Sequence, residues 1–447
     1  MQNSKTLRHF GSLIILLLIP VTWWVTVATW EAEVAGLYSF ARAAFNVLVT
    51  AAGLAVVYIL SGKPPARPRI QAVALGFTTA AVCLLLLEIP ALFLGFNFQK
   101  VFGTTGPNTA LHLSGGVNQA DPVLIHIHWP HSSFTGEVAG NLAQLGIPAA
   151  RRYPVSVNYD QNGFRNDVDF EQADIAVIGD SFVEAAILPR EESLVGQLES
   201  RLQMPVVNLG QIAYGFRQEL EVLKRYALPL SPRLVVWAVF GGNDLRDVGW
   251  YEMQRENFGK PEAEPLLRER LFSRNLLVAA GASLDELVRA MLDIPTGKAL
   301  DHSGLFTRAD GVTERVYFGQ TADPWNAHQW AVATGTLQEG RDLTRQQGAE
   351  FVVIYIPRKF RIYKDHLELS GGTEIAEWEV NNLPEALGAW CAENGIRFLD
   401  ITPHLAGHVQ AGVHPYFVDD VHWNPLGHET AARVITDHLS TEKIFPF

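Results

Sequence analysis

Three long apolar stretches near the N-terminus constrain this chain most strongly. All of them lie within the first hundred residues, and only Glu88 interrupts the third with a charge. A stretch of about 20 apolar residues can cross the hydrocarbon core of a bilayer. We therefore predict an α-helical transmembrane anchor over residues 1–98, with three helices at about residues 11–30, 43–62 and 70–95.

Two alternatives to this anchor stay open. The first stretch could be a cleaved signal peptide, although its apolar part exceeds the usual length of about 7–15 residues. Pro90 could instead split the third stretch into two spans, which would reverse the topology. Even with a signal peptide, the two later stretches would hold the protein in a membrane.

The charges beside the apolar stretches predict an orientation. Lys5 and Arg8 precede the first stretch, and Lys63, Arg67 and Arg69 lie between the second and the third. Positive residues concentrate on the cytoplasmic side of membrane proteins. We therefore expect a multi-pass protein of a bacterial-type plasma membrane, whose residues after about position 98 lie on the periplasmic or extracellular side.

The composition excludes several kinds of partner. The chain has 447 residues and a net charge of −12, without the clustered Lys and Arg that nucleic acid binding needs. Its two cysteines, Cys83 and Cys391, cannot form a disulfide framework or a zinc knuckle. The sequence contains neither a P-loop nor a Gly-x-Gly-x-x-Gly motif. We expect no nucleic acid partner and no cofactor.

The chain changes character after the predicted anchor. Residues 99–173 contain frequent Gly and Pro, and we interpret them as an irregular lead-in that packs on a larger domain. Over residues 174–447, short apolar strands alternate with helices, which is typical of a parallel sheet covered on both faces. We predict a three-layer α/β/α sandwich with a five-stranded parallel sheet of flavodoxin-like type. An insert at about residues 245–329, with an amphipathic helix at Ala279–Leu292, should form a lid or a subdomain.

Polar residues follow three of the predicted strands and should meet at one edge of the sheet. The strand ends read Gly179-Asp180-Ser181, Asn208-Leu209-Gly210 and Gly242-Asn243-Asp244, and a DDVH segment ends at His422. Each has an ordinary structural interpretation, because Ser often caps helices and Gly and Asn often form turns. Taken together, they form a set that could catalyse acyl transfer.

Acyl transfer to a serine needs a base within hydrogen-bond reach and a carboxylate that orients the base. Asp419 and His422, three positions apart, could supply both for Ser181. Asp420 is a second candidate for the acid, but its spacing of two positions fits less well. The tetrahedral intermediate also needs hydrogen-bond donors. We predict an oxyanion hole from the N–H groups of Ser181 and Gly210 and the side-chain amide of Asn243.

The blocks IGDSF, NLG, GGND and DDVH resemble, in this order, those of the SGNH (GDSL-type) hydrolase superfamily. The resemblance covers about residues 174–438 without the insert. It implies Ser181 as the nucleophile, His422 as the base and Asp419 as the orienting acid, with Gly210 and Asn243 in the oxyanion hole. The DDVHW stretch is also similar to the Asp-x-His-Trp segment of alginate-type O-acetyltransferases, in which, unlike here, that segment precedes the serine.

Two further features near the predicted site have open interpretations. His126, His128 and His131 have a spacing that could ligate zinc, but polar decoration of the surface is favoured, and we expect no metal. Arg165, in the NGFRN segment, either lies in an Asn-Gly turn or reaches the rim of the pocket and binds substrate.

We therefore expect a membrane-anchored, extracytoplasmic serine esterase. It would cleave acyl esters, with acetyl favoured, from a cell-envelope polysaccharide or lipid. The main alternative is an O-acyltransferase that moves an acetyl group onto an exported polysaccharide and requires a membrane acyl-donor protein. A catalytically silent module of envelope assembly is a further alternative.

Overall fold

The computed structural model divides the chain into two compact units. One consists of Met1–Asn108 and Pro261–Asp293, and the other of Thr109–Lys260 and Ile294–Phe447. The middle of the predicted insert therefore belongs to the unit of the N-terminal helices. The structure describes residues 2–27, 33–34, 37–61, 66–103, 118–142, 147, 151–260, 266–292, 297–319 and 325–442.

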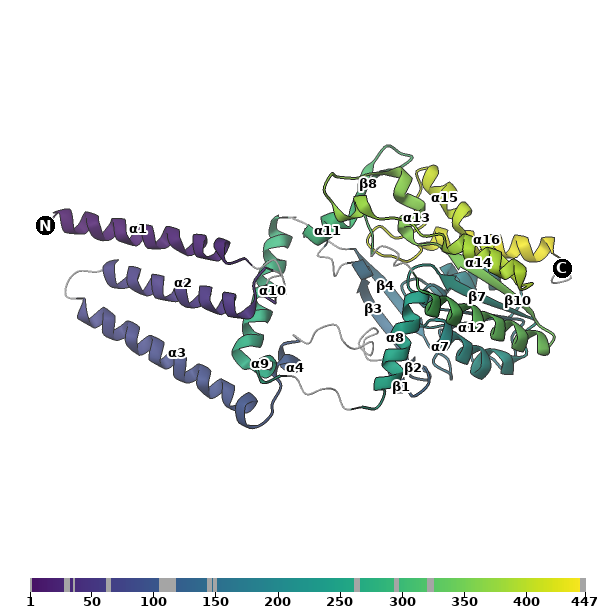
Figure 1. The fold of residues 1–447 in the computed structure, drawn as a ribbon, viewed down its shortest axis with the longest axis horizontal. Coiled ribbons are helices and arrows are strands. Elements are labelled where there is room, and N and C mark those ends of the chain that lie inside the picture. The colour runs from purple at the N-terminus through teal and green to yellow at the C-terminus, as the bar shows by residue number, and fades with distance from the viewer. Residues whose placement is uncertain are drawn as a thin grey trace. The chain divides into compact units, whose positions relative to one another are not determined.

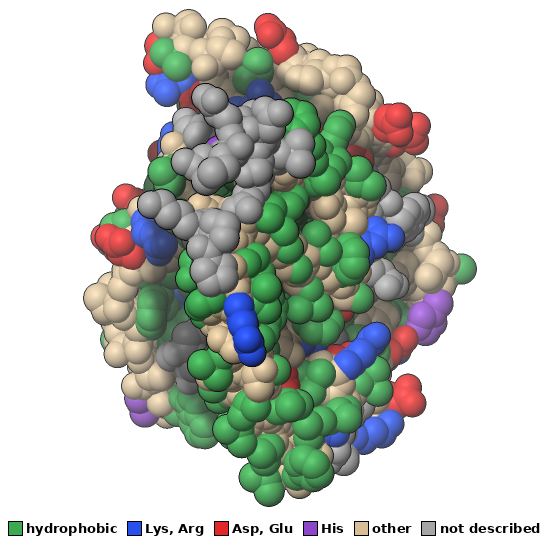
Figure 2. All heavy atoms as spheres, turned by 90° about the vertical axis from the view of Figure 1, so that its left-hand side faces the viewer, with side chains coloured by type: hydrophobic (Ala, Val, Ile, Leu, Met, Phe, Trp, Pro, Cys, Tyr) green, Lys and Arg blue, Asp and Glu red, His purple; other side chains and the backbone are tan. Residues whose placement is uncertain are grey.

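The first unit contains three long helices, α1 (Gln2–Val25), α2 (Phe40–Ser61) and α3 (Arg67–Phe93). Helices α2 and α3 are long and apolar enough to cross a membrane, and α1 has a shorter apolar part, His9–Val25. Many of their large hydrophobic side chains are exposed, and Figure 2 shows such side chains gathered over one face of the molecule. These helices are compatible with a membrane anchor or, for α1, a signal sequence. The predicted residues 28–30 of the first span lie outside the described residues.

Helix α10 (Phe272–Leu292) packs on this helical unit, together with the short helices α4 (Phe98–Phe102) and α9 (Leu267–Arg270). The Glu88 carboxylate of α3 accepts hydrogen bonds from the N–H groups of Phe272 and Ser273, both at 2.8 Å. The first N–H groups of a helix lack partners within it, and a negative charge is favourable there. This contact explains why an acidic residue interrupts an otherwise apolar stretch.

The second unit is built on a five-stranded parallel sheet in the order β12-β10-β7-β5-β6. Figure 1 labels two of its neighbouring strands, β7 and β10. In chain order the sheet is 2-1-3-4-5 read from the β6 edge, which is the flavodoxin-like order. The strands are apolar and mostly buried, as expected for a sheet covered on both faces. The predicted sheet is confirmed. Its strands are β5 (Ile175–Gly179), β6 (Val206–Gly210), β7 (Leu234–Phe240), β10 (Glu350–Ile356) and β12 (Arg397–Asp400).

Two hydrophobic layers flank the sheet because successive strand residues point to opposite faces. On β5, Ile175 and Val177 join one layer, whereas Ala176 and Ile178 join the other. The first layer contains α6 (Leu194–Leu202), α13 (Lys359–Tyr363), α15 (Thr402–Gln410) and α16 (Pro425–Thr441). The second contains α7 (Phe216–Val222), α8 (Asp244–Asn257), α12 (Ala327–Gln346) and α14 (Leu383–Glu393).

The lead-in before the sheet contains two antiparallel strand pairs, and a third small sheet combines the end of the insert with a short strand after β10. The lead-in pairs are β1 (Asn118–Asp121) with β2 (Ile125–His128) and β3 (Ser133–Ala139) with β4 (Arg152–Asn158). The third sheet combines β8 (Ser303–Thr307), β9 (Thr313–Tyr317) and β11 (Leu367–Glu368). The remaining helical segments are α5 (Ser181–Glu184), α11 (Gly297–Asp301), a π-helical turn (Leu223–Ala227) and short 3₁₀ turns at Arg190–Glu192, Leu228–Leu230, Lys364–His366 and Glu374–Glu377.

Two glycines of α12 provide a matched test of how this helix packs on the sheet. A Cβ on Gly340 would lie 2.6 Å from the ring of the buried Trp237, whereas a Cβ on Gly335 would meet nothing within 4 Å. We predict that Gly340→Ala lowers the free energy of unfolding by about 1–3 kcal/mol through overpacking. Gly335→Ala should raise it by about 0.5–1 kcal/mol, because Ala favours a helix over Gly. Denaturation followed by tryptophan fluorescence measures both, and shifts of the same sign would contradict this packing.

Candidate active site

The structure brings Ser181 and His422 into direct contact, although they lie far apart in the sequence. Ser181 follows the end of β5 and begins α5, while His422 lies in the irregular segment before α16. The Ser181 Oγ and the His422 Nε2 are 2.7 Å apart. This is hydrogen-bond distance, and it allows the imidazole to accept the hydroxyl proton.

Asp420, and not Asp419, holds the histidine. The His422 Nδ1 lies 2.5 Å from the Asp420 Oδ1, which also accepts the backbone N–H of His422 at 2.8 Å. The preference for Asp419 assumed that residues three positions apart share one side of a helical turn. The segment is a non-helical turn instead, in which a carboxylate bonds the N–H two residues later, as Asx turns do. The sequence-based assignment of the acid is therefore corrected.

Asp419 ties the segment to the lead-in. Its carboxylate accepts the hydroxyl of Tyr153 at 2.5 Å and the backbone N–H of Arg151 at 2.9 Å. Burial raises the pKa of the Tyr153 hydroxyl, and the bond to Asp419 and its charge raise it further. Asp419 thus positions the neighbouring residues. Among the described residues, no hydrogen bond joins its carboxylate to the imidazole of His422.

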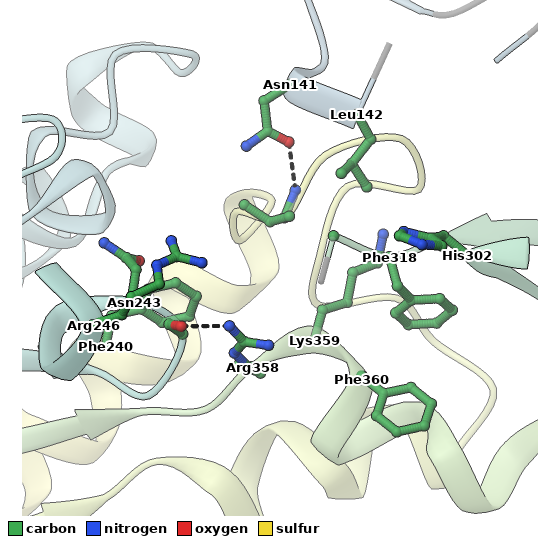
Figure 3. A pocket seen from close by; sticks show the side chains of 13 residues that line it. Asn141, Leu142, Phe240, Asn243, Arg246, His302, Phe318, Arg358, Lys359 and Phe360 are labelled. Carbon is green, nitrogen blue, oxygen red and sulfur yellow. Dashed lines mark hydrogen bonds between the residues drawn. The ribbon is translucent and has the colours of Figure 1, made fainter. Parts of the chain in front are cut away.

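Asn141 and Lys359 also hold this segment, and the sequence pattern identified neither. The backbone N–H of Asn141 donates to the Asp420 Oδ2 at 2.6 Å, and its side-chain oxygen accepts from the N–H of Val421 at 3.1 Å (Figure 3). The buried Lys359 Nζ lies within 3.1 Å of four carbonyl oxygens, those of Tyr317, Phe417, Val418 and Asp420. No local sequence signal marks such contacts, because the partners are distant along the chain.

The electrostatics of the pair favour a charged carboxylate and a basic imidazole. Burial alone would raise the pKa of Asp420, but the His422 charge and the hydrogen bonds from His422 and Asn141 outweigh it and lower this pKa. Burial alone would lower the pKa of His422, but the charge and hydrogen bond of Asp420 outweigh it and raise this pKa. Burial also raises the pKa of Asp180, beside the serine, to about 7. The Asp180 carboxylate caps α5 through the N–H of Phe182.

The predicted oxyanion hole is only partly available in this structure. The N–H of Ser181 opens α5 and is one of the donors that a helix leaves unsatisfied. The Asn243 amide donates to Asp247 and lies at a cavity, with a second N–H to offer. The N–H of Gly210, however, donates to the side-chain oxygen of Asn208 at 2.9 Å. This N–H is therefore not available to an oxyanion in this structure, and the predicted role of Gly210 is corrected.

Gly210 has a packing role instead. A Cβ at this position would lie 2.4 Å from the backbone nitrogen of Glu184 and 2.6 Å from the Cβ of Val183. Only a glycine lets the end of β6 approach the turn after the nucleophile so closely.

Arg165 does not reach a pocket rim. Its side chain is buried, and its guanidinium donates to the backbone carbonyls of Glu184, Ala185 and Leu188. It thereby holds the chain just after α5, where Ala185 has a left-handed backbone with φ of 51°. The proposed substrate contact of Arg165 is corrected to this structural role.

The three histidines of the HIHWPH segment have separate partners. The His126 Nε2 lies 2.9 Å from the carbonyl oxygen of Ile212, and the His128 Nε2 lies 2.9 Å from the Glu184 Oε1. His131 is exposed. Within the described part of the chain, no group of three or more His, Cys, Asp or Glu side chains could hold a metal ion.

Two cavities contain candidate site residues: Asn243 lines one, and Ser181 and His422 line the other. The first, which we call the polar cleft, has a volume of about 490 Å³ and is lined by Asn141, Asn243, Arg246, His302, Arg358 and Lys359 among others (Figure 3). The second, the apolar cavity, has a volume of about 250 Å³, and both Ser181 and His422 line it. Its other walls are mostly aliphatic or aromatic. A serine, a base and an acid with adjoining cavities are the components that acyl transfer requires.

Part of the sheet domain matches a known protein family. Residues 316–446 match the family described as the SGNH hydrolase-like domain of the acetyltransferase AlgX. The matched segment contains His422 and both aspartates, but not Ser181. The resemblance to SGNH hydrolases that the motif blocks predicted is thus confirmed for this segment, which is similar to the AlgX-type domain. No curated protein sequence matches the chain.

Several solved structures also resemble the domain. TesA shares 15% identity at a TM-score of 0.33, covering 60% of this chain and 98% of its own. A GDSL-like lipase from Bacteroides thetaiotaomicron shares 13% identity at a TM-score of 0.31, covering 60% and 88%. The lipase/acylhydrolase from Enterococcus faecalis shares 12% identity at a TM-score of 0.31, covering 60% and 95%. At these scores the neighbours carry no functional conclusion.

The two adjacent aspartates allow a matched test of the triad. We predict that Asp420→Asn lowers kcat on an activated ester by about 10³–10⁴-fold. The amide would favour the wrong tautomer of His422 and, being neutral, would not stabilise the imidazolium that forms during the reaction. Asp419→Asn keeps an acceptor for Tyr153, so its effect should stay below about tenfold, the scale of one hydrogen bond. Steady-state kinetics of both variants checks this, and the reverse ranking would restore Asp419 as the acid.

The raised pKa of His422 predicts the pH dependence. The imidazole must be neutral to accept a proton, so activity is present above its pKa and is lost as the pH falls through it. This acidic limb of kcat/KM should lie above about pH 6.5, the usual value for histidine. Asp180→Asn, which retains the helix cap, should move the limb less than Asp420→Asn does. A limb below the usual histidine value in the wild type would contradict the assignment.

Proposed function

We propose that this protein is a membrane-anchored serine enzyme that acts on acyl esters outside the cytoplasm through an acyl-serine intermediate. The observation that carries the proposal is the continuous chain from the Ser181 Oγ to the His422 Nε2 at 2.7 Å and from the His422 Nδ1 to the Asp420 Oδ1 at 2.5 Å. The location rests on the apolar helices α2 and α3 and on the positive residues around them.

The chemistry would proceed in two halves. His422 takes the hydroxyl proton as the Ser181 oxygen attacks the acyl carbonyl, and the N–H of Ser181 and the amide of Asn243 stabilise the oxyanion. His422 then returns the proton to the leaving alcohol, and the acyl group stays on Ser181. In the second half, His422 deprotonates an acceptor, which attacks the acyl-serine and restores the free hydroxyl. Asp420 holds the imidazole in the required tautomer throughout.

The polar cleft suggests the nature of the alcohol. Its polar lining includes amides, arginines and a histidine, which can donate to hydroxyl-rich groups, and apolar side chains such as Phe240 and Phe318 also line the cleft. An acyl ester of a cell-envelope polysaccharide or lipid headgroup fits such a lining. With water as the acceptor, the protein is an esterase of this substrate.

Transfer to a sugar hydroxyl is the second candidate. The similarity of residues 316–446 to the domain of an acetyltransferase supports it. The same residues would act, with a sugar hydroxyl in place of water in the second half. An acyl-donor protein in the membrane would then be the partner. Release of free acid, compared with acylation of an added oligosaccharide, separates the two candidates.

A fluorophosphonate probe tests the nucleophile. We expect the full-length protein to be labelled, because the probe reacts with a serine activated by an adjacent base. Ser181→Ala should abolish labelling, whereas Ser156→Ala, on the exposed side of β4, should not change it. Gel fluorescence with identification of the modified peptide provides the measurement. Labelling that persists in Ser181→Ala would reject this nucleophile, and unlabelled, inactive wild type would indicate a silent module.

A further inference from the structure

We propose that the apolar cavity is an acyl-chain pocket that selects acyl chains longer than acetyl. A chain of about six carbons is expected to fit it well. The inference rests on the proposed acyl-serine chemistry and specifies its substrate. It replaces the acetyl preference that the sequence suggested. Three properties of the cavity carry it, namely its place beside the nucleophile, the nature of its walls and its size.

The cavity begins at the reacting atoms. Ser181 and His422 both line it, so an acyl group on the Ser181 oxygen would enter it directly. The residues that follow the nucleophile, Ala185 to Ile187, form one wall, and Ile212 adds to it. The hydrogen bonds of Arg165 and Glu184 fix both segments, because Arg165 binds the carbonyls after α5 and Glu184 accepts the N–H of Ile212 at 2.7 Å. The wall is therefore rigidly held.

The opposite wall is the inner face of the β3–β4 pair. Residues alternate along both strands, so Phe134 and Val138 on β3 and Val155 and Val157 on β4 face inward. The residues between them, such as Thr135 and Ser156, are exposed. A strand pair with one apolar face and one polar face covers an apolar space, and here that space adjoins the nucleophile.

The polar groups that touch the cavity are already paired or neutral. The Glu184 carboxylate accepts from His128, from the hydroxyl of Tyr159 at 2.9 Å and from the N–H of Ile212. Burial lowers the pKa of His428 to about 3, so its ring is neutral, and its Nδ1 accepts the N–H of Leu194 at 3.1 Å. Asp420 is bound to His422. An aliphatic chain would thus meet no unpaired charge among the described side chains of this wall.

The size excludes a close fit to acetyl. A dry cavity of about 150 Å³ is large enough to bind benzene, which has six carbons. The apolar cavity measures about 250 Å³, so a single methyl group would leave most of it empty. Each methylene buried from water contributes about 0.8 kcal/mol, which corresponds to about fourfold in kcat/KM. Partial burial of several methylenes should therefore favour a longer chain at least tenfold.

Chain-length selectivity tests the inference in the full-length, detergent-solubilised protein. Nitrophenyl acetate, butyrate, hexanoate and octanoate are compared, with the Ser181→Ala rate subtracted. We expect kcat/KM for hexanoate to exceed that for acetate by about tenfold or more. A Ser181-dependent preference for acetate would reject the inference and leave the proposed function intact. If Ser181→Ala keeps full activity on every ester, both the inference and the proposed function are rejected.

Variants of the cavity walls test the location of the chain. Ala186→Phe should fill the cavity and lower the hexanoate-to-acetate ratio by about tenfold, whereas Phe134→Ala should enlarge it and shift the optimum to octanoate. The matched control is Ser156→Phe, which adds the same ring to the exposed face of β4 and should not change the ratio. Equal hexanoate-to-acetate ratios in Ala186→Phe and in the control would show that the acyl chain binds elsewhere. If Ala186→Phe misfolds, Phe134→Ala still provides the test.

Discussion

The two hydrogen bonds that Asp420 accepts from His422 are the interaction on which the site depends. One comes from the ring and one from the backbone, so a single carboxylate sets both the tautomer of the base and the shape of its loop. The other Asp420 oxygen is held by Asn141, and the loop carbonyls are held by the buried Lys359. The imidazole is thus held against Ser181, as the proposed reaction requires.

The lead-in supplies much of this support. Tyr153 binds Asp419, Arg165 binds the carbonyls after α5, and His128 pairs with Glu184, which lines the apolar cavity. Buried polar groups are costly unless they are bonded, so these contacts are specific constraints on the backbone. The same segment, through β3 and β4, also covers the cavity. One wall of the apolar cavity therefore comes from residues that precede the sheet.

The sequence predicted the sheet, its strand order and the pairing of Ser181 with His422, because buried strands and strand-end motifs leave local patterns. It did not predict which aspartate orients the base, since Asp419 and Asp420 differ only in how a non-helical turn points them. The bond from Gly210 to Asn208 and the burial of Arg165 were missed for a related reason. Both depend on tertiary neighbours, and the local sequence does not indicate which partner either residue has. The wide apolar cavity could not be foreseen, because its two walls lie in separate parts of the chain.

The central claim is that an acyl group resides on Ser181 during the reaction. Acid quenching of the protein during turnover of an activated ester, followed by peptide mass spectrometry, tests it most directly. The account predicts that the peptide containing Ser181 gains the mass of the acyl group, and that the gain accumulates most when deacylation is slow. Ester turnover without an adduct at Ser181, or with an adduct on another residue, would contradict the account.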